Sequence, residues 1–226
     1  MADVKRDTTT FITKTTTLAS PPLVPELKLH LATDAVALWQ MTEAELERAN
    51  VPPPFWAFAW AGGQALARYI IDRPAAVAGK HVLDVAAGSG IAGLAALWAS
   101  AAHVVANEID PFAAAVINMN ARANGLTLGL KISERDMLGD PPLVTDGAPL
   151  WDVVLAGDVC YEREMSDRMF DWLRQHSAAG ALVLIGDPGR AYVPRDGVVD
   201  IAHYSVPTPL ALEDREARET AVLQVL

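Results

Sequence analysis

The sequence predicts an α/β fold in which a mainly parallel sheet carries helices on both faces. From residue 80 onward, short apolar runs alternate with segments of helical periodicity, the pattern of successive β-α-β units. The apolar runs are continuous, as in strands that are buried on both faces. The chain has 226 residues and is 51% hydrophobic, so it can bury a large core. We therefore expect one main domain.

The expected elements alternate along this domain. Strands are expected at 82–86, 103–107, 129–133, 152–156 and 181–185, and helices at 91–100, from Pro111 to about Asn124, and from about Met165 to Gly180. Two more strands are expected near 199–205 and 220–226. No long helical pattern separates these two, so we expect an antiparallel pair at the end of a seven-stranded sheet.

An N-terminal extension, 1–53, is expected to precede the main domain, 54–226. Its first 20 or so residues are polar and Thr-rich, and part of this stretch is expected to be a flexible arm. Leucines alternate with polar residues at 27–31, which suggests a short strand or an extended segment along the surface. A capping-box spacing before Pro52 predicts a short helix at 43–50.

Composition excludes several kinds of function. A net charge of −10 disfavours nucleic acid as a partner, because phosphate contacts need clustered Lys and Arg. The single cysteine, Cys160, excludes an intramolecular disulfide, and the His spacing fits no common metal motif, so we expect no metal cofactor. No apolar run reaches the ~20 residues of a membrane span. With no secretory leader apparent, we expect a cytoplasmic protein.

Acidic residues lie at the carboxyl ends of four successive strands of the predicted sheet. They are Asp84, Glu108, Asp136 and Asp158. Ligands of parallel α/β sheets bind beyond the carboxyl ends of the strands, where these side chains are expected to meet. One acid at that edge is unremarkable, whereas four at successive strand ends are hard to explain by folding alone.

The turn after the first strand could bind either of two adenosine cofactors. Gly88–Gly93 matches GxGxxG, and Glu108 lies 20 residues after Gly88, as in a dinucleotide site. Asp84, however, would repel a pyrophosphate, and the chain lacks the Tyr-x-x-x-Lys of common one-domain dehydrogenases. S-adenosylmethionine has no phosphate. Its ribose suits Glu108, its adenine amine suits Asp136, and its ammonium suits acids at the first turn. An NAD oxidoreductase remains the less favoured alternative.

The same residues carry a family resemblance. Asp84-x-Ala86-x-Gly88-x-Gly90 and Glu108-Ile-Asp-Pro resemble the class I (seven-β-strand) methyltransferases, whose Rossmann-like fold binds S-adenosylmethionine. Asp158-Val-Cys-Tyr161 is similar to the Asp-x-x-Tyr signature of the family 16 protein methyltransferases, many of which act on lysine. Pro54–Gln64 together with Gly157–Glu162 is most similar to the lysine methyltransferases of the electron transfer flavoprotein β-subunit. Ala86 departs from the class, in which Gly is common at this position.

The resemblance implies roles for individual residues. The residues expected to bind S-adenosylmethionine, and its product S-adenosylhomocysteine, are Trp60, Asp84, Ala86, Gly88, Gly90, Glu108, Asp136 and Met137. Asp158 is expected to be catalytic and to orient the incoming ammonium, with Tyr161 offering a ring face or an oxygen. Gly157 would allow close backbone approach. The alternative is that Asp158 caps the following turn and Tyr161 is a packed aromatic.

The resulting hypothesis is a protein-lysine N-methyltransferase whose protein substrate is the electron transfer flavoprotein β-subunit. A lysine methyltransferase of a ribosomal protein is a close alternative, and small-molecule methylation stays open. Base methylation is disfavoured, because the Asn/Asp-Pro-Pro-Tyr/Phe of that class is replaced by Asp158-Val-Cys-Tyr161. An alternative of another class is a non-catalytic S-adenosylmethionine-binding module that acts through partners.

Overall fold

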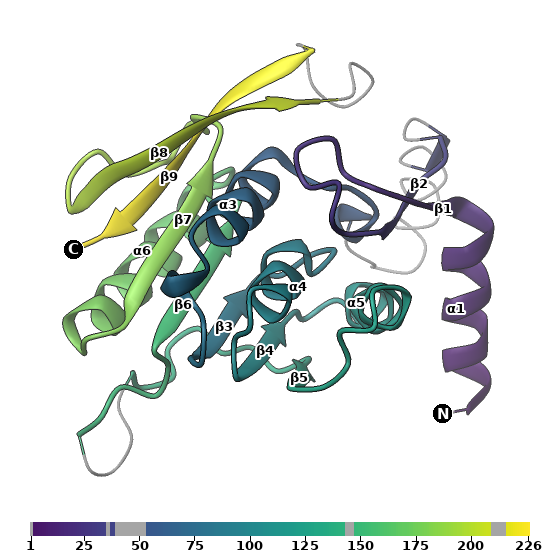
Figure 1. The fold of residues 1–226 in the computed structure, drawn as a ribbon, viewed down its shortest axis with the longest axis horizontal. Coiled ribbons are helices and arrows are strands. Elements are labelled where there is room, and N and C mark those ends of the chain that lie inside the picture. The colour runs from purple at the N-terminus through teal and green to yellow at the C-terminus, as the bar shows by residue number, and fades with distance from the viewer. Residues whose placement is uncertain (1, 35–36, 39–52, 143–146, 209–215) are drawn as a thin grey trace.

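The computed structural model describes residues 2–34, 37–38, 53–142, 147–208 and 216–226 (Figure 1). The helix expected at 43–50 lies outside these ranges. No helix in the described ranges is long and apolar enough to cross a membrane.

Within the described residues, seven strands form one sheet in the order β5-β4-β3-β6-β7-β9-β8. The strands are β3 (His81–Val85), β4 (His103–Asn107), β5 (Leu130–Ser133), β6 (Val153–Gly157), β7 (Leu182–Asp187), β8 (Val198–Pro207) and β9 (Ala217–Val225). The first five run parallel, and β9 pairs antiparallel with both β7 and β8. The predicted mainly parallel sheet with an antiparallel C-terminal pair is confirmed.

Helices cover both faces of this sheet. The helices of the domain are α3 (Ala61–Asp72), α4 (Ile91–Trp98), α5 (Pro111–Ala123) and α6 (Arg163–Ala178), with short 3-10 helices η1 (Phe55–Ala57) and η2 (Pro74–Ala76). In Figure 1, α3 and α4 lie on the near side of the sheet and α6 lies behind β7.

Consecutive residues of the central strands point into opposite cores. Val82 and Val153 pack into the core beneath α3 and α4, while their neighbours Leu83 and Val154 pack into the core beneath α6. All four side chains are fully buried. Because both faces are covered, the strands are apolar throughout, and this explains the continuous hydrophobic runs in the sequence.

The start of the chain forms a helix that its composition does not predict. Helix α1 (Ala2–Thr15) leads into β1 (Thr16–Ala19), which pairs antiparallel with β2 (Leu29–Ala32). Ile12 of α1 is fully buried beside Trp56 and Val116, in a cluster formed with η1 and α5. A Thr-rich segment has low helix propensity, so tertiary packing rather than local preference decides this helix. The strand expected at 27–31 is confirmed as β2.

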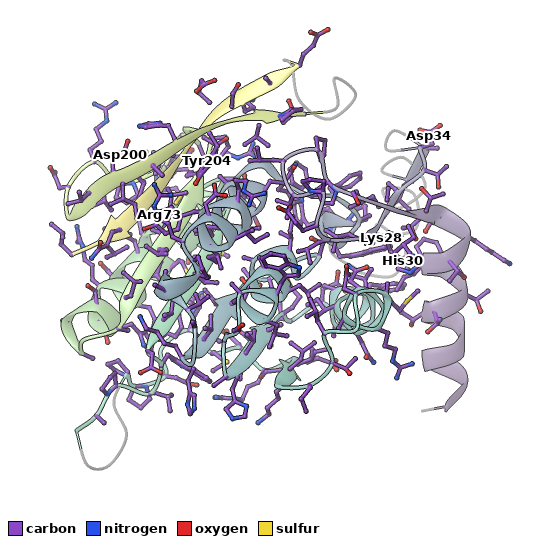
Figure 2. The ribbon with its side chains drawn as sticks, in the orientation of Figure 1. Lys28, His30, Asp34, Arg73, Asp200 and Tyr204 are labelled. Carbon is purple, nitrogen blue, oxygen red and sulfur yellow. The ribbon has the colours of Figure 1, made fainter. Side chains whose placement is uncertain are left out.

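Asn120 of α5 and Asn124, the C-cap of that helix, hold the segment around β2. The Lys28 amide donates to Oδ1 of Asn124 at 2.8 Å, and Nδ2 of Asn124 donates back to the Lys28 carbonyl at 2.6 Å. The His30 amide donates to Oδ1 of Asn120 at 2.7 Å. Figure 2 shows Lys28 and His30, both in the N-terminal segment, next to α5. The side chains of Asn120 and Asn124 therefore attach the extension to the domain by forming hydrogen bonds with its backbone N–H and C=O groups.

Candidate functional site

The carboxyl ends of the parallel strands surround a cavity of about 460 Å³. A smaller cavity adjoins it and shares part of its wall. The predicted site residues that line the larger cavity are Trp60, Ala86, Gly88, Glu108, Asp136, Asp158 and Tyr161. Asp84 lines the smaller cavity, whereas Gly90 and Met137 line neither. Residues as far apart in the sequence as Trp60 and Tyr161 are thus brought to one place by the fold.

The turn between β3 and α4 is built from left-handed residues. Ala86, Gly88 and Gly90 have φ of 52°, 54° and 78°. Ala86 has a Cβ, so this conformation costs it roughly 1 kcal/mol, which explains why glycine is common here in the class. Gly90 is the N-cap of α4, and a Cβ there would lie 3.0 Å from Ile117. Gly90 therefore lets the turn pack closely against Ile117 and does not itself line the cavity.

Asp84 lies within β3, one residue before its end, and supports the first turn of α4. Its Oδ2 accepts a hydrogen bond from the Gly93 amide at 2.8 Å. Burial raises the pKa of Asp84 to about 7, with a further increase from the charge of Glu108. A cation bound in the adjoining cavity would favour the ionised form. Binding of a ligand ammonium by Asp84 remains a prediction, and the bond to Gly93 is an additional structural role.

Glu108 connects the end of β4 to the glycine turn. Its Oε2 accepts from the Gly88 amide at 2.9 Å, and its Oε1 accepts from the Asp110 amide at 3.3 Å. Asp110 is the N-cap of α5, accepting from Phe112 at 2.8 Å, which confirms the predicted start of that helix. Glu108 is therefore held at the cavity wall by backbone donors from two loops.

The segment after β5 places neighbouring residues in different environments. Asp136 is exposed at the cavity, and its Oδ1 accepts from the Leu138 amide at 3.0 Å. Met137 is buried in the core beneath α6, and Leu138 lines the cavity in its place. The Met137 side chain is therefore a core residue, and cofactor binding by Met137 remains a prediction. In an irregular turn, the sequence does not show which of two neighbouring side chains faces the cavity.

Asp158 is buried at the junction of the two cavities, with both carboxylate oxygens engaged. Oδ2 accepts from the Gly63 amide in the first turn of α3 at 3.1 Å, and Oδ1 accepts from Nη2 of Arg190 at 3.0 Å. Burial raises the pKa of Asp158 to about 6, although Arg190 opposes this rise. Its φ of 56° is unusual for a residue with a side chain. Asp158 thus binds the start of a helix 95 residues earlier rather than the turn that follows it.

Close backbone packing brings α3 to Asp158. A Cβ on Gly62 would lie 2.1 Å from the Gly186 carbonyl oxygen, and one on Gly186 would lie 2.1 Å from that of Gly62. A Cβ on Gly157 would lie 3.0 Å from Cα of Gly63, which confirms that Gly157 allows close approach. These glycines let the Gly63 amide reach the Asp158 carboxylate.

Aromatic and apolar side chains form the rim of the cavity. Tyr161 is 48% exposed, and its ring centroid lies 5.5 Å from that of Phe55. Ile109 also lines the cavity and is 65% exposed. Burial, and the charge of Glu108, raise the pKa of Tyr161. The Tyr161 ring therefore packs against Phe55, while about half of the residue remains accessible at the cavity.

Arg190 is a charged residue of the site that the sequence did not reveal. It lines the cavity, contacts Asp158 and lies 5.8 Å from the centre of the Trp60 ring. Its amide donates to Oδ1 of Asp187 at 2.6 Å, which closes the turn after β7. The sequence Asp187-Pro188-Gly189 predicts a turn after this strand. A turn motif, however, does not show where the side chain that follows it points.

Comparison with known proteins identifies the family. The chain is 38% identical to the electron transfer flavoprotein beta subunit lysine methyltransferase of Danio rerio over 216 residues, covering 93% of this chain and 80% of that one. The Mus musculus protein of the same description is 34% identical, over 90% of this chain and 78% of that one. This chain belongs to the family of the electron transfer flavoprotein beta subunit lysine methyltransferases. It is a class I, S-adenosylmethionine-dependent protein-lysine methyltransferase, as its sequence motifs implied.

Two further similarities concern parts of the molecule. Residues 65–157 match the family model of the ribosomal protein L11 methyltransferase (PrmA). The crystal structure of magnesium protoporphyrin IX methyltransferase from Synechocystis PCC 6803 has a TM-score of 0.51 and 13% identity, covering 73% of this chain and 78% of that one. This structural similarity supports the Rossmann-like fold.

Proposed function

We propose that this methyltransferase transfers a methyl group from S-adenosylmethionine to a lysine of the electron transfer flavoprotein β-subunit. The observation that carries the proposal is the buried carboxylate of Asp158 at the wall of the large cavity, with the exposed Tyr161 ring at its mouth. A buried acid can accept hydrogen bonds from an amine, and an aromatic ring can bind a cation. The names of the two related proteins from Danio rerio and Mus musculus specify this subunit and support the choice of substrate.

The residues of the cavity fit S-adenosylmethionine. Glu108 would accept hydrogen bonds from the ribose hydroxyls, Asp136 from the adenine amine, and Asp84 would face the ammonium end. The backbone of Gly88 approaches the cavity without a Cβ, leaving room beside Glu108. When bound, the cofactor supplies a methyl group activated by a positive sulfur. The protein's own task is to position the nucleophile and to keep water out.

The lysine amine must be neutral to attack, yet its ordinary pKa is about 10.4. We propose that Asp158 accepts a hydrogen bond from the incoming ammonium and orients its nitrogen toward the methyl group. The proton that the ammonium loses passes by way of Asp158 to water. Tyr161 would hold the side chain of the lysine at the mouth, and Trp60 borders the path beyond it.

A ribosomal protein is the second candidate substrate. The ribosomal protein L11 methyltransferase of Deinococcus radiodurans is 36% identical over 124 residues, covering 54% of this chain and 45% of that one. The family-model match ends at residue 157, so it includes the cofactor side of the cavity but neither Tyr161 nor Arg190. The similarity to electron transfer flavoprotein methyltransferases extends over 93% of the chain and favours their substrate.

The test is methylation of purified proteins. We expect labelled S-adenosylmethionine to mark the β-subunit of the electron transfer flavoprotein of the same organism, and mass spectrometry to place the label on lysine. Ribosomal protein L11 serves as the comparison substrate. Labelling of L11 alone, or label on a residue other than lysine, would overturn the proposal. The expectations of a cytoplasmic location and of no metal requirement remain predictions; in the described part of the chain, no cluster of three or more potential metal ligands occurs.

A further inference from the structure

The positively charged guanidinium of Arg190 pairs with the Asp158 carboxylate, which is proposed to accept a hydrogen bond from the substrate amine. Its Nη2 lies 3.0 Å from Oδ1 of Asp158. The hydrogen bond between the Arg190 amide and Asp187 anchors its backbone at the end of β7. The guanidinium also lies near the Trp60 ring, at the cavity wall. Asp158, Arg190 and Trp60 therefore meet where the amine would enter.

The other groups around Asp158 are mostly acidic or neutral. Asp187 at the end of β7 raises the pKa of Asp158, while the Gly63 amide at the start of α3 lowers it. Cys160, two residues after Asp158, is a buried thiol whose pKa rises to about 12, so it stays neutral. Tyr161 follows it, and Asp84 of β3 lines the cavity that Asp158 shares. Among these groups, Arg190 supplies the positive charge that opposes the effect of burial.

We propose that Arg190 is a positioning residue that keeps Asp158 ionised and disfavours the protonated form of the lysine amine beside it. The inference rests on the proposed lysine methylation. One fixed charge produces both effects, because an opposite charge stabilises a carboxylate and a like charge destabilises an ammonium. Amines beside a second cation are activated as nucleophiles for this reason. The lysine gives up its proton through Asp158 to water, and its nitrogen bonds to the methyl carbon as the carbon–sulfur bond breaks.

The test compares Arg190→Met with Arg190→Lys, using the full chain and saturating S-adenosylmethionine. We expect the acid side of the kcat/KM profile, which reports the ionisation of Asp158 in the free enzyme, to move to higher pH by about one unit or more in Arg190→Met. Activity should therefore fall ~10-fold at pH about 5 and below and recover at high pH. Arg190→Lys keeps the charge and should keep the profile. A loss of rate that is equal at all pH values, or an unchanged profile in Arg190→Met, would overturn the proposal.

A second readout does not depend on lysine methylation. The pKa of Asp158 is measured by carboxyl 13C NMR in the wild type and in both variants, and we expect it to rise in Arg190→Met only. Arg168→Met is the matched control, because Arg168 lines the same cavity on another element. An unchanged pKa in Arg190→Met overturns the role of Arg190. A raised pKa in a protein that methylates no lysine would instead refute the proposed function.

Discussion

A hydrogen bond between Asn120 and Ser89 links the N-terminal segment to the cofactor turn. Nδ2 of Asn120 donates to the Ser89 carbonyl at 2.9 Å, and Oδ1 of the same side chain accepts from the His30 amide at 2.7 Å. Asn120 is fully buried in α5. One amide thus satisfies backbone groups from β2 and from the turn between β3 and α4. Through Asn120, β2 is therefore connected to the turn that borders the cavity.

Asn120→Ala should lower both stability and cofactor affinity. The change leaves the Ser89 carbonyl and the His30 amide without this partner, at a cost of about 1–3 kcal/mol for each buried group left unsatisfied. Thermal unfolding and calorimetry with S-adenosylmethionine measure the two effects. Asn124→Ala is the control, since it releases Lys28 but makes no bond to the turn. Equal cofactor affinity in the two variants would refute the link.

Asp158→Asn should abolish methyl transfer while leaving S-adenosylmethionine affinity nearly unchanged. Asparagine can still accept the Gly63 amide and tolerates a positive φ, so the fold should be kept. The lost charge should reduce kcat at least ~100-fold, within the range for acid–base groups. In the wild type, activity should fall below pH about 6 as Asp158 becomes protonated. Normal turnover in the variant would show that Asp158 is not catalytic.

Glu108→Gln should weaken S-adenosylmethionine binding roughly 10- to 100-fold, the value of a hydrogen bond to a charged group. The glutamine oxygen can still accept the Gly88 amide, so the turn should keep its shape. Titration calorimetry reports the dissociation constant. Glu134→Gln removes an exposed acid that does not line the cavity and should change nothing. If both variants bind equally well, Glu108 does not hold the ribose.

Gly62→Ala should unfold or misplace the start of α3. Its Cβ would overlap the Gly186 carbonyl oxygen, and backbone cannot move aside as a flexible side chain can. We expect a loss of stability well above the roughly 1–2 kcal/mol cost of a left-handed alanine. Gly125→Ala measures that smaller cost, because Gly125 has a φ of 68° and open space around it. Similar melting temperatures for the two variants would contradict the close contact.

His176→Leu should make the protein less sensitive to acid. Burial lowers the pKa of His176 to about 4, and neither ring nitrogen has a hydrogen-bond partner among the described residues. The unfolded chain binds a proton below pH about 6.5, so the wild type loses up to about 3 kcal/mol as pH falls from about 6.5 to about 4. Denaturant unfolding at several pH values measures this.

The raised pKa values of Asp84, Asp110 and Asp158 act in the opposite direction in both proteins. The difference between wild type and His176→Leu therefore isolates the histidine. If the free energy of unfolding declines equally in the wild type and in His176→Leu from pH 6.5 to pH 4, then His176 binds its proton as readily in the folded protein as in the unfolded chain.

The sequence by itself determined the order of strands and helices along the chain and the mainly parallel direction of the strands. It also determined the sheet edge at which the acidic residues lie. These features follow from local periodicity and from the rule that parallel strands end together. It also determined the class of cofactor, because Asp84, Glu108 and Asp136 occur at fixed offsets from strand ends. Such information is local, so it can be read along the chain.

Only the tertiary structure decided which groups touch. The Gly63 amide and the Arg190 guanidinium both reach Asp158 from distant segments, and no spacing along the chain encodes these contacts. The same holds for α1, a Thr-rich helix that depends on packing of Ile12 against η1 and α5. Burial and charge at Asp158 depend on those neighbours, so its pKa and its chemistry are properties of the fold.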